Sequence, residues 1–252
     1  MSTLRTGEQL EAAARLLWAV WEARTAAERT QVISTSMLRT LAHTGNYVAG
    51  AFLGEQMIGC TVGFLETGSG QVNSLHSHIT GVHQPERNRG TGFALKRHQR
   101  QWALENGLDL VTWTFDPLVS RNAYFNLCKL GGTVTDYRPD FYGQMDDGAN
   151  TGDRTDRLLV EWTLRAEWVE RAMDNDDPGL RRHASVEPGA ELIAVPEDIG
   201  LLRQTDPLQA LNERFAVRDR FLSLFAEGYR VVGMTRTREY VLLPHDRIAS
   251  YE

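Results

Sequence analysis

Hydrophobic residues recur at intervals of three and four positions near the start of the chain: Leu10, Ala13, Leu17 and Trp21. This spacing places one apolar stripe along a helix. Thr6 and Gln9 have the spacing of a capping box, in which two side chains satisfy the first free amides of a helix. The pattern predicts a helix over residues 7–24, and a second, shorter helix is expected over 35–43.

Between residues 47 and 164 the pattern changes to short β-rich runs bounded by turn residues. These runs predict strands over 47–52, 57–65, 75–82, 110–115, 134–137 and 158–164. The segment 66–74, ETGSGQVNS, is polar and contains glycine, so it is predicted to be a flexible connection. Helical patterns over 91–105 and 120–130 each stop at a glycine.

The order of these elements predicts an α/β (α+β) fold with a mixed, mostly antiparallel sheet flanked by helices. After Trp168 the composition changes, and residues 173–189, MDNDDPGLRRHASVEPG, are charged and turn-prone, which predicts a linker. The elements beyond it form a small α/β annex, with a strand over 191–195, a helix over 207–227, and strands over 229–234 and 239–243. The predicted domains are therefore residues 1–168 and 169–252.

Composition narrows the classes of function. Of 252 residues, 42% are hydrophobic and 24% are charged, which is typical of a globular protein. A formal net charge of −6 argues against nucleic acid or a membrane surface as a partner. Cys60 and Cys128 lack the spacing of a disulfide framework or a metal site. The first residues do not resemble a signal peptide and no long apolar run occurs, so a cytoplasmic location is expected.

The segment 83–100, HQPERNRGTGFALKRHQR, carries the strongest chemical signal. Between Arg87 and Gly92 the chain is expected to turn sharply and enter a helix, so that backbone amides converge at the positive end of the helix dipole. Five basic residues fall in this segment: Arg87, Arg89, Lys96, Arg97 and Arg100. The spacing fits neither a Walker loop nor a Rossmann fingerprint. The segment predicts a site for a polyphosphate anion.

Two histidines on the preceding strand are candidate bases. His76 and His78 are two residues apart, so both rings are expected on one face of the strand, together with Thr80 and Val82. Histidine titrates near neutral pH and can accept a proton from an ammonium group, and His78 is the first choice because it is nearer the loop. Hydrogen bonding within a partly buried sheet is the alternative role for both rings. No third residue has convincing metal-ligand spacing, so no metal is expected.

The motif Arg87-x-x-Gly90-x-Gly92, after a strand that ends at Val82, resembles the acyl-CoA signature R/Q-x-x-G-x-G/A of the GNAT N-acyltransferases. Residues 120–132, SRNAYFNLCKLGG, resemble the second GNAT signature, and the element order also matches, so the resemblance covers about two thirds of the chain. The segments LHSHITGV, DFYG and TDRLLVEW are similar to those of a bacterial GNAT subgroup with a C-terminal extension. That subgroup is associated with N-acylation, including N-succinylation, of amino acids.

The resemblance implies transfer of an acetyl or succinyl group from acyl-CoA to the amino group of a small molecule, with an amino acid among the candidates. It implies a set of residues that bind the acyl-CoA co-substrate: Gly81, Val82, Arg87, Asn88, Arg89, Gly90, Thr91, Gly92, Asn126 and Lys129. Within this set, a backbone amide near Gly81 or Val82 receives the oxyanion. His76 and His78 have the same offset from Arg87 as the paired histidines of arylalkylamine N-acetyltransferases.

The general acid is the weak point of the resemblance. The family's tyrosine is replaced here by Leu127, so Tyr124 is the candidate acid, with Tyr137 and Tyr142 as alternatives. Packing explains Tyr124 equally well, and it explains Cys128 better than a nucleophilic role does. If no acid is present, the CoA thiolate can leave unaided, because a thiol with a pKa of about 8.5 is a tolerable leaving group.

Acceptor recognition is less well specified. Arg214 or Arg218 can bind a carboxylate by bidentate pairing. Four other residues are candidates for the acceptor side by position alone: Asp140, Tyr142, Asp156 and Arg157. The hydrophobic stripe of helix 207–227 can pack on the main domain or on a second subunit, so a homodimer is one expected assembly. The alternative function is a CoA-binding regulatory module without catalysis, and Leu127 favours it.

Overall fold

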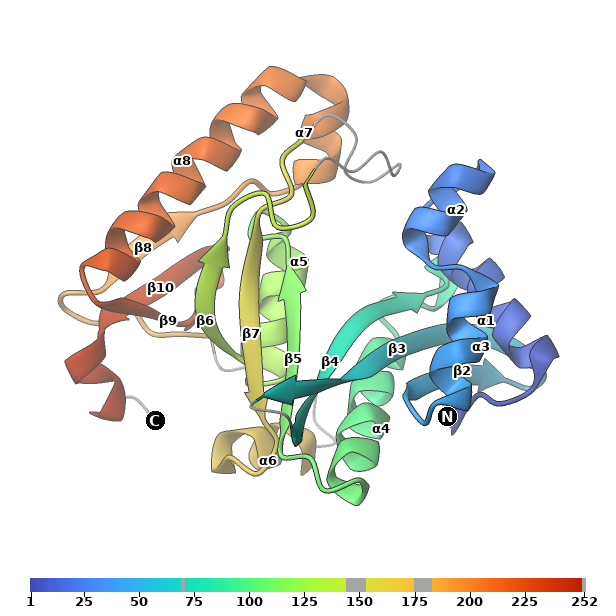
Figure 1. The fold of residues 1–252 in the computed structure, drawn as a ribbon. Coiled ribbons are helices and arrows are strands. Elements are labelled where there is room, and N and C mark those ends of the chain that lie inside the picture. The colour runs from blue at the N-terminus through green and yellow to red at the C-terminus, as the bar shows by residue number, and fades with distance from the viewer. Residues whose placement is uncertain (69–70, 144–152, 175–182, 251–252) are drawn as a thin grey trace. The chain divides into compact units, whose positions relative to one another are not determined.

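The computed structural model describes residues 1–68, 71–143, 153–174 and 183–250 (Figure 1). By backbone contacts the chain divides into two compact units, and the division falls between Trp113 and Thr114, inside strand β5. The first unit covers residues 1–113, and the second covers the described residues from 114 onward. The predicted boundary after residue 168 stays a prediction.

The first unit contains three N-terminal helices, four strands, a further helix and the start of a fifth strand. Its elements are β1 (Ser2–Thr3), α1 (Gly7–Val20), α2 (Ala26–Val32), α3 (Thr35–His43), β2 (Tyr47–Leu53), β3 (Gln56–Gly68), β4 (Gln71–Val82), α4 (Thr91–Glu105) and β5 (Leu110–Phe115). The strands follow the order β1-β2-β3-β4-β5, with β4 and β5 parallel and the other pairs antiparallel. The predicted mixed, mostly antiparallel sheet is confirmed.

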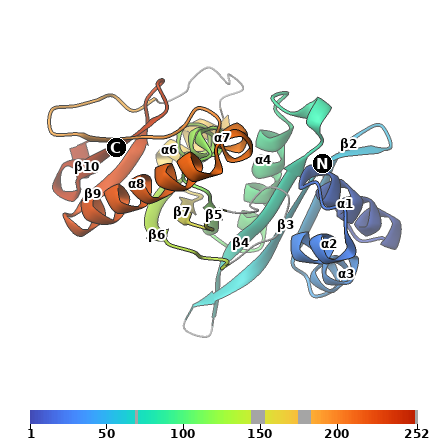
Figure 2. The same cartoon turned by 90° about the horizontal axis from the view of Figure 1, so that it is seen from above.

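Helices cover both faces of this sheet (Figure 2). Helix α1 packs so closely on β4 that a Cβ atom at Gly81 would lie 2.9 Å from Leu17 and from Trp21. On the other face, a Cβ atom at Gly59 of β3 would meet Leu95 of α4 at 3.0 Å. The close approach on each side explains why glycine stands at these two positions.

The second unit combines the end of β5 with two further strands, a small sheet and long helix α8. Its elements are α5 (Ser120–Tyr124), a π-helical turn (Phe125–Lys129), β6 (Thr133–Arg138), β7 (Arg157–Thr163), α6 (Glu167–Asp174), β8 (Glu191–Ala194), α7 (Ile199–Thr205), α8 (Pro207–Ala226), β9 (Tyr229–Met234) and β10 (Glu239–Pro244). Strands β6 and β7 pair antiparallel, and β8-β10-β9 form a separate antiparallel sheet.

The C-terminal segment of the second unit packs on residues 114–143. The rings of Phe221 and Tyr137 stack at 5.4 Å, and Phe221 also meets Tyr240 at 5.1 Å. The Tyr240 hydroxyl donates a 2.8 Å hydrogen bond to the carbonyl of Pro117. The predicted α/β annex therefore shares an aromatic core with the segment that follows β5.

Two predictions for the first unit are wrong. The first helix ends at Val20 rather than at residue 24, and the undetected helix α2 follows, with a capping box formed by Thr25 and Glu28. Only Val32 of α2 is buried, so the hydrophobic pattern gave no signal. The predicted flexible connection 66–74 lies mostly in strands, because β3 runs to Gly68 and β4 begins at Gln71.

Three further predictions change in the second unit. The predicted helix 120–130 is α-helical only to Tyr124 and continues as a π-helical turn, in which the Leu130 amide donates to the Phe125 carbonyl. Helix α6 was not predicted; it buries Val169 and Met173 four positions apart and includes the first two residues of the predicted linker, of which residues 175–182 lie outside the described residues. Helix α7 was not predicted, and Asp198 caps its first turn. Among the described residues, no helix is long and apolar enough to span a membrane.

Candidate functional site

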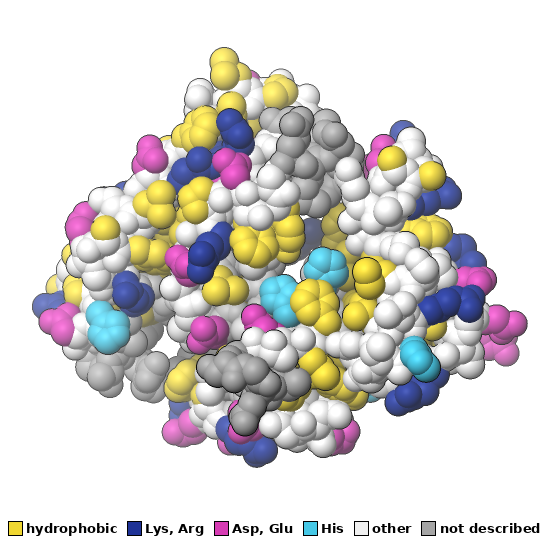
Figure 3. Space-filling view, viewed as in Figure 1, with side chains coloured by type: hydrophobic (Ala, Val, Ile, Leu, Met, Phe, Trp, Pro, Cys, Tyr) yellow, Lys and Arg dark blue, Asp and Glu magenta, His cyan; other side chains and the backbone are white. Residues whose placement is uncertain are grey.

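A β-bulge in β4 sets the position of the two histidines. Ser77 pairs with Gly63 of β3 and Ile79 pairs with Val62, so His78 is an extra residue without a partner on β3. Both histidine rings lie against Phe64 of β3, at 5.2 Å for His76 and 5.6 Å for His78. Figure 3 shows histidine side chains beside hydrophobic ones over β3 and β4. The prediction that the two rings share one face is confirmed.

The same bulge overturns the prediction that Thr80 and Val82 share the histidine face. One extra residue in a strand reverses the alternation of side chains beyond it. Val82 pairs with Gly59, and a Cβ atom at Gly59 would point at α4. A Cβ atom at Gly81, the residue before Val82, would instead point at α1. Thr80 and Val82 therefore lie on the α4 face, and the histidines lie on the α1 face.

Both histidines are poised to be neutral. Removal from water lowers the pKa of the His76 imidazole, with Glu66 opposing this shift and Lys96 adding to it. Partial removal from water also lowers the pKa of His78, although its side chain stays partly exposed, and the proximity of His76 adds to the effect. A neutral imidazole can accept a proton at physiological pH, which a base for an ammonium group requires.

The loop after β4 has the geometry of an anion site. Asn88 and Gly90 both adopt left-handed conformations, with φ of 63° and 87°. Gly90 is the N-cap of α4, and no side chain in the described part of the chain caps this end or accepts from the first amides of the helix. A Cβ atom at Gly90 would meet nothing within 4 Å. Open space in front of uncapped amides fits an oxygen-rich anion. Thr91 and Gly92 supply two of these backbone amides.

The basic residues of this segment have different surroundings. Arg87 donates from Nε to the carbonyl of Val82 at 3.2 Å, which ties the loop to β4. Arg89 is exposed and lies 3.5 Å from Glu86. Lys96 instead is buried on the sheet side of α4, where its amine donates to Ser77 and Gln99 at 2.8 and 3.0 Å. Burial lowers the pKa of Lys96 to about 7. Its assignment to the anion cluster is therefore wrong.

The free edge of β4 carries one candidate oxyanion donor. The His83 amide donates to Ile58 of β3. Because successive amides of a strand point to opposite sides, the Val82 amide points away from β3 and the Gly81 amide points toward it. In the first unit, parallel pairing with β5 covers Leu75 and His76, before the bulge. Of the two predicted residues, the geometry favours Val82.

The remaining predicted binding residues lie in the second unit, on α5 and its π-helical turn. Asn126 is buried, and the ammonium group of Lys129 lies 5.8 Å from the centre of the Tyr124 ring. Tyr124 also stacks on His183 at 5.2 Å, a partner that the sequence did not indicate. Tyr124 therefore takes part in packing within this unit.

The alternative acids differ in accessibility. The Tyr137 hydroxyl is buried and donates to Asp156 at 2.6 Å, and burial, followed by this carboxylate, raises the pKa of Tyr137 far above its usual range. The Tyr142 hydroxyl is partly exposed and shares a 3.1 Å hydrogen bond with Thr114. Of these two, only Tyr142 presents a hydroxyl at the surface.

Neither cysteine has the surroundings of a nucleophile. Burial raises the pKa of Cys60 to about 12 and the pKa of Cys128 to about 11. Thiols at such pKa values carry almost no thiolate near neutral pH. Among the described residues, no group of three or more histidine, cysteine or acidic side chains is placed to hold a metal ion.

The arginines proposed for the acceptor are occupied inside the second unit. Arg214 is fully buried and binds Asp116 at 2.6 Å and Asp153 at 2.7 Å. Arg218 binds the buried Asp156. Arg157 is also buried, and its guanidinium lies 5.1 Å from the Tyr142 ring. Because aspartates of the same unit already pair with Arg214 and Arg218, the structure argues against the expectation that either arginine binds a carboxylate of the acceptor.

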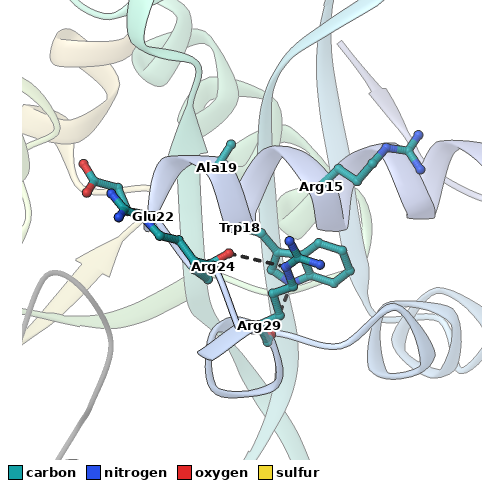
Figure 4. A pocket seen from close by; sticks show the side chains of 7 residues that line it. Arg15, Trp18, Ala19, Glu22, Arg24 and Arg29 are labelled. Carbon is teal, nitrogen blue, oxygen red and sulfur yellow. Dashed lines mark hydrogen bonds between the residues drawn. The ribbon is translucent and has the colours of Figure 1, made fainter. Parts of the chain in front are cut away.

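A cationic pocket of about 480 Å³ opens at the end of α1 (Figure 4). Its lining is Arg15, Trp18, Ala19, Glu22, Ala23, Arg24 and Arg29. The indole of Trp18 donates to the carbonyls of Arg29 and Ile33, and the Arg29 guanidinium lies 5.3 Å from the Trp18 ring. The sequence gave no indication of this pocket, because it depends on helix α2.

Structures of known proteins share this architecture. No protein-family model and no curated protein sequence matches the chain. Its structure is similar to the ribosomal-protein-alanine N-acetyltransferase of Brucella melitensis, with a TM-score of 0.52 and 15% identity over 64% of this chain and 96% of that one. The chain has the GNAT fold.

Two further GNAT-fold structures support this assignment. The ribosomal-protein-S18-alanine N-acetyltransferase of Escherichia coli gives a TM-score of 0.51 at 14% identity, over 65% of this chain and 92% of that one. The protein yncA of Salmonella typhimurium, solved with its cofactor acetyl-CoA, gives 0.53 at 14% identity, over 66% and 93%. The GNAT fold thus accounts for about two thirds of the chain.

Proposed function

We propose that the protein transfers an acyl group from acyl-CoA to the amino group of a small molecule. One observation carries the proposal: a loop leads from a bulged strand with two histidines to α4, which begins at a left-handed glycine and has no side-chain cap from any described residue. Such a helix end suits the pyrophosphate of CoA. A protein of the same fold, yncA, has been solved with acetyl-CoA, which supports this ligand class.

The candidate site residues of the first unit have these roles in the proposed reaction. The amides of Thr91 and Gly92 bind the pyrophosphate, with Arg87 and Arg89 beside them. The Val82 amide stabilises the oxyanion that forms when the amine attacks the thioester carbonyl. A neutral histidine, His76 or His78, takes a proton from the acceptor ammonium so that its nitrogen can attack. As the amide forms, the C–S bond breaks and the nitrogen loses its second proton, and the departing CoA thiolate takes up a proton to give the free thiol.

Three residues of the second unit have proposed roles that rest on the resemblance. Asn126 contacts the pantetheine arm and Lys129 approaches a phosphate, as the resemblance implies. Tyr124 is the proposed acid for the thiolate, although Leu127 occupies the family's usual position. Without an acid, the thiolate leaves directly, because thiols ionise at about pH 8.5.

The acyl group and the acceptor form the finer part of the proposal. We propose an acetyl or succinyl donor and a small amine, with amino acids among the candidates. Among the described residues, no carboxylate forms an ion pair with Arg15, Arg24 or Arg29 of the cationic pocket. That pocket, rather than α8, therefore offers three arginines, with one carboxylate from Glu22, to an acceptor that carries an anionic group.

Thiol release tests the function. The purified protein is incubated with acetyl-CoA or succinyl-CoA and a panel of amines, and CoA affinity is measured by calorimetry. The proposal predicts release above background hydrolysis with at least one pair. CoA binding without release for any pair would favour a regulatory module, the alternative that Leu127 supports.

Histidine variants locate the base. His76→Ala and His78→Ala should leave CoA affinity nearly unchanged, and the variant that removes the base should lose turnover most near neutral pH. His43→Ala, at the end of α3, is the control and should behave like wild type. Unchanged pH–rate profiles in both site variants would exclude a histidine base.

A further inference from the structure

Three side chains from three neighbouring strands form a chain of hydrogen bonds in the first unit. The Thr112 hydroxyl of β5 donates to Glu66 Oε2 of β3 at 3.0 Å. His76 Nδ1 of β4 lies 2.9 Å from the same Thr112 oxygen. Ser74 also donates to Glu66, at 2.8 Å. Thr112 and Ser74 are buried, at 7% and 3% exposure, whereas Glu66 is exposed, so the two hydroxyl groups are shielded from water and the carboxylate is not.

The donors and acceptors in this chain leave one arrangement of protons. A threonine hydroxyl has a single hydrogen, and Thr112 gives it to Glu66. The oxygen of Thr112 can then only accept from His76, so Nδ1 must carry the proton of the neutral ring. The other ring nitrogen, Nε2, is therefore the one with a free lone pair.

We infer that Thr112 and Glu66 are positioning residues that hold His76 as the base, with its proton on Nδ1 and Nε2 free to react. This inference rests on the proposed function. In the step it describes, Nε2 accepts one proton from the acceptor ammonium, directly or through a water molecule. The ammonium becomes a neutral amine, the ring becomes an imidazolium, and the Glu66 carboxylate stabilises the new positive charge through Thr112.

His78 lacks this support. Its ring contacts Phe64, and it has no hydrogen bond to any residue that the structure describes. The bulge also leaves its backbone without a partner residue on β3. A base must be held in one orientation to be effective, because misplacement of a reacting group is costly. The structure thus favours His76 over His78, the reverse of the choice made from loop proximity.

The charged groups around His76 define its pH dependence. Glu66 lies on β3, His78 on β4, and Lys96 on α4 behind the sheet. Glu66 raises the pKa of His76, while burial and Lys96 lower it. Replacing Glu66 with glutamine removes the charge but keeps an oxygen that can accept from Thr112. The acidic limb of the kcat/KM profile should therefore move to lower pH in Glu66→Gln.

Nitrogen-15 NMR of the histidine rings tests the inference without any turnover. In the wild-type protein above the pKa of His76, the expected spectrum is that of a ring protonated at Nδ1. Thr112→Val, which keeps the β-branched shape and removes the hydroxyl, should lose this tautomer and lower kcat/KM about tenfold or more. Glu66→Gln should keep the tautomer. The matched control is Thr80→Val, since Thr80 pairs with Thr61 on the other face of the sheet.

The outcomes separate the inference from the proposed function. A wild-type His76 protonated at Nε2, or a Thr112→Val spectrum equal to that of wild type, would overturn the positioning role of Thr112 and Glu66 even if thiol release is observed. A tautomer that follows the prediction in a protein that releases no thiol would instead contradict the proposed function. Retained CoA affinity in each variant confirms that it is folded.

Discussion

The arginines before α4 and those of α8 have the same chemistry and opposite surroundings. Arg89 is exposed, and Arg87 is bonded to a backbone carbonyl. Arg214 is fully buried between two aspartates. Burial alone would raise the pKa of Asp116, but the hydrogen bonds and the charge of Arg214 hold this pKa well below its usual range. A positive residue is a stronger indication of a ligand site at the surface, where Arg89 has an ion pair with Glu86 at 3.5 Å and stays exposed, than in the interior, where two aspartates surround Arg214.

The largest effect should come from removing the buried charge. Arg214→Met leaves Asp116 and Asp153 without their partner, and should lower the free energy of unfolding by about 3–5 kcal/mol in urea titrations. Arg220→Met, on the same helix, removes a surface pair with Glu191 and should cost less than about 1 kcal/mol. Equal losses of unfolding free energy in the two variants would show that the buried ion pairs of Arg214 stabilise this unit no more than a surface pair does.

Lys96 sharpens the comparison, because it lies in the basic segment but is buried like Arg214. Its pKa of about 7 in the folded state is below the value of about 10.4 for an unfolded chain. The unfolded state therefore holds the proton more tightly between these values, so stability falls as pH drops from about 10 to 7 and is constant below that.

Lys96→Met should remove this dependence. The difference in unfolding free energy between wild type and Lys96→Met should change by a few kcal/mol between pH 7 and pH 10, measured by urea titration. Lys96→Gln, which also removes the charge, should show the same loss of slope. Parallel curves for wild type and both variants would mean that Lys96 titrates as an exposed amine.

A smaller effect is expected from filling the space in front of α4. Gly90 and Gly107 stand at opposite ends of this helix, both with left-handed φ and both with open space at the Cβ position. Leucine at either position should cost about 1–2 kcal/mol of stability. Only Gly90→Leu should also weaken CoA binding, by about tenfold or more in calorimetry. Equal CoA affinities of Gly90→Leu and Gly107→Leu would show that CoA does not bind at the loop before α4.

The sequence predicted the parts of the fold that depend on local pattern. The helix Thr91–Glu105 and the strand Leu110–Phe115 were located to the residue, because turn residues bound them on both sides. Helix α2 was missed because it buries a single residue, although its capping box was visible in the sequence. The strand ends within 66–74 were missed because this segment is polar and contains glycine, which is typical of a turn.

The site was predicted less completely, for reasons that are non-local. The bulge at His78 follows from the pairing of β3 with β4, and one strand alone cannot reveal it. Glu66 and Thr112 meet His76 only because three strands are neighbours. The burial of Lys96, by contrast, could have been anticipated, since it lies on the stripe of Leu95, Gln99 and Ala103 that faces the sheet.

The most direct test of the central claim is a titration of the nitrogen-15-labelled protein with acetyl-CoA, followed by amide chemical shifts. If the uncapped start of α4 binds the pyrophosphate, the largest shifts should occur at the amides of Thr91, Gly92 and Phe93, and Gly107 at the other end of the helix should not move. Saturable binding that leaves these three amides unshifted, or no binding at all, would contradict the account.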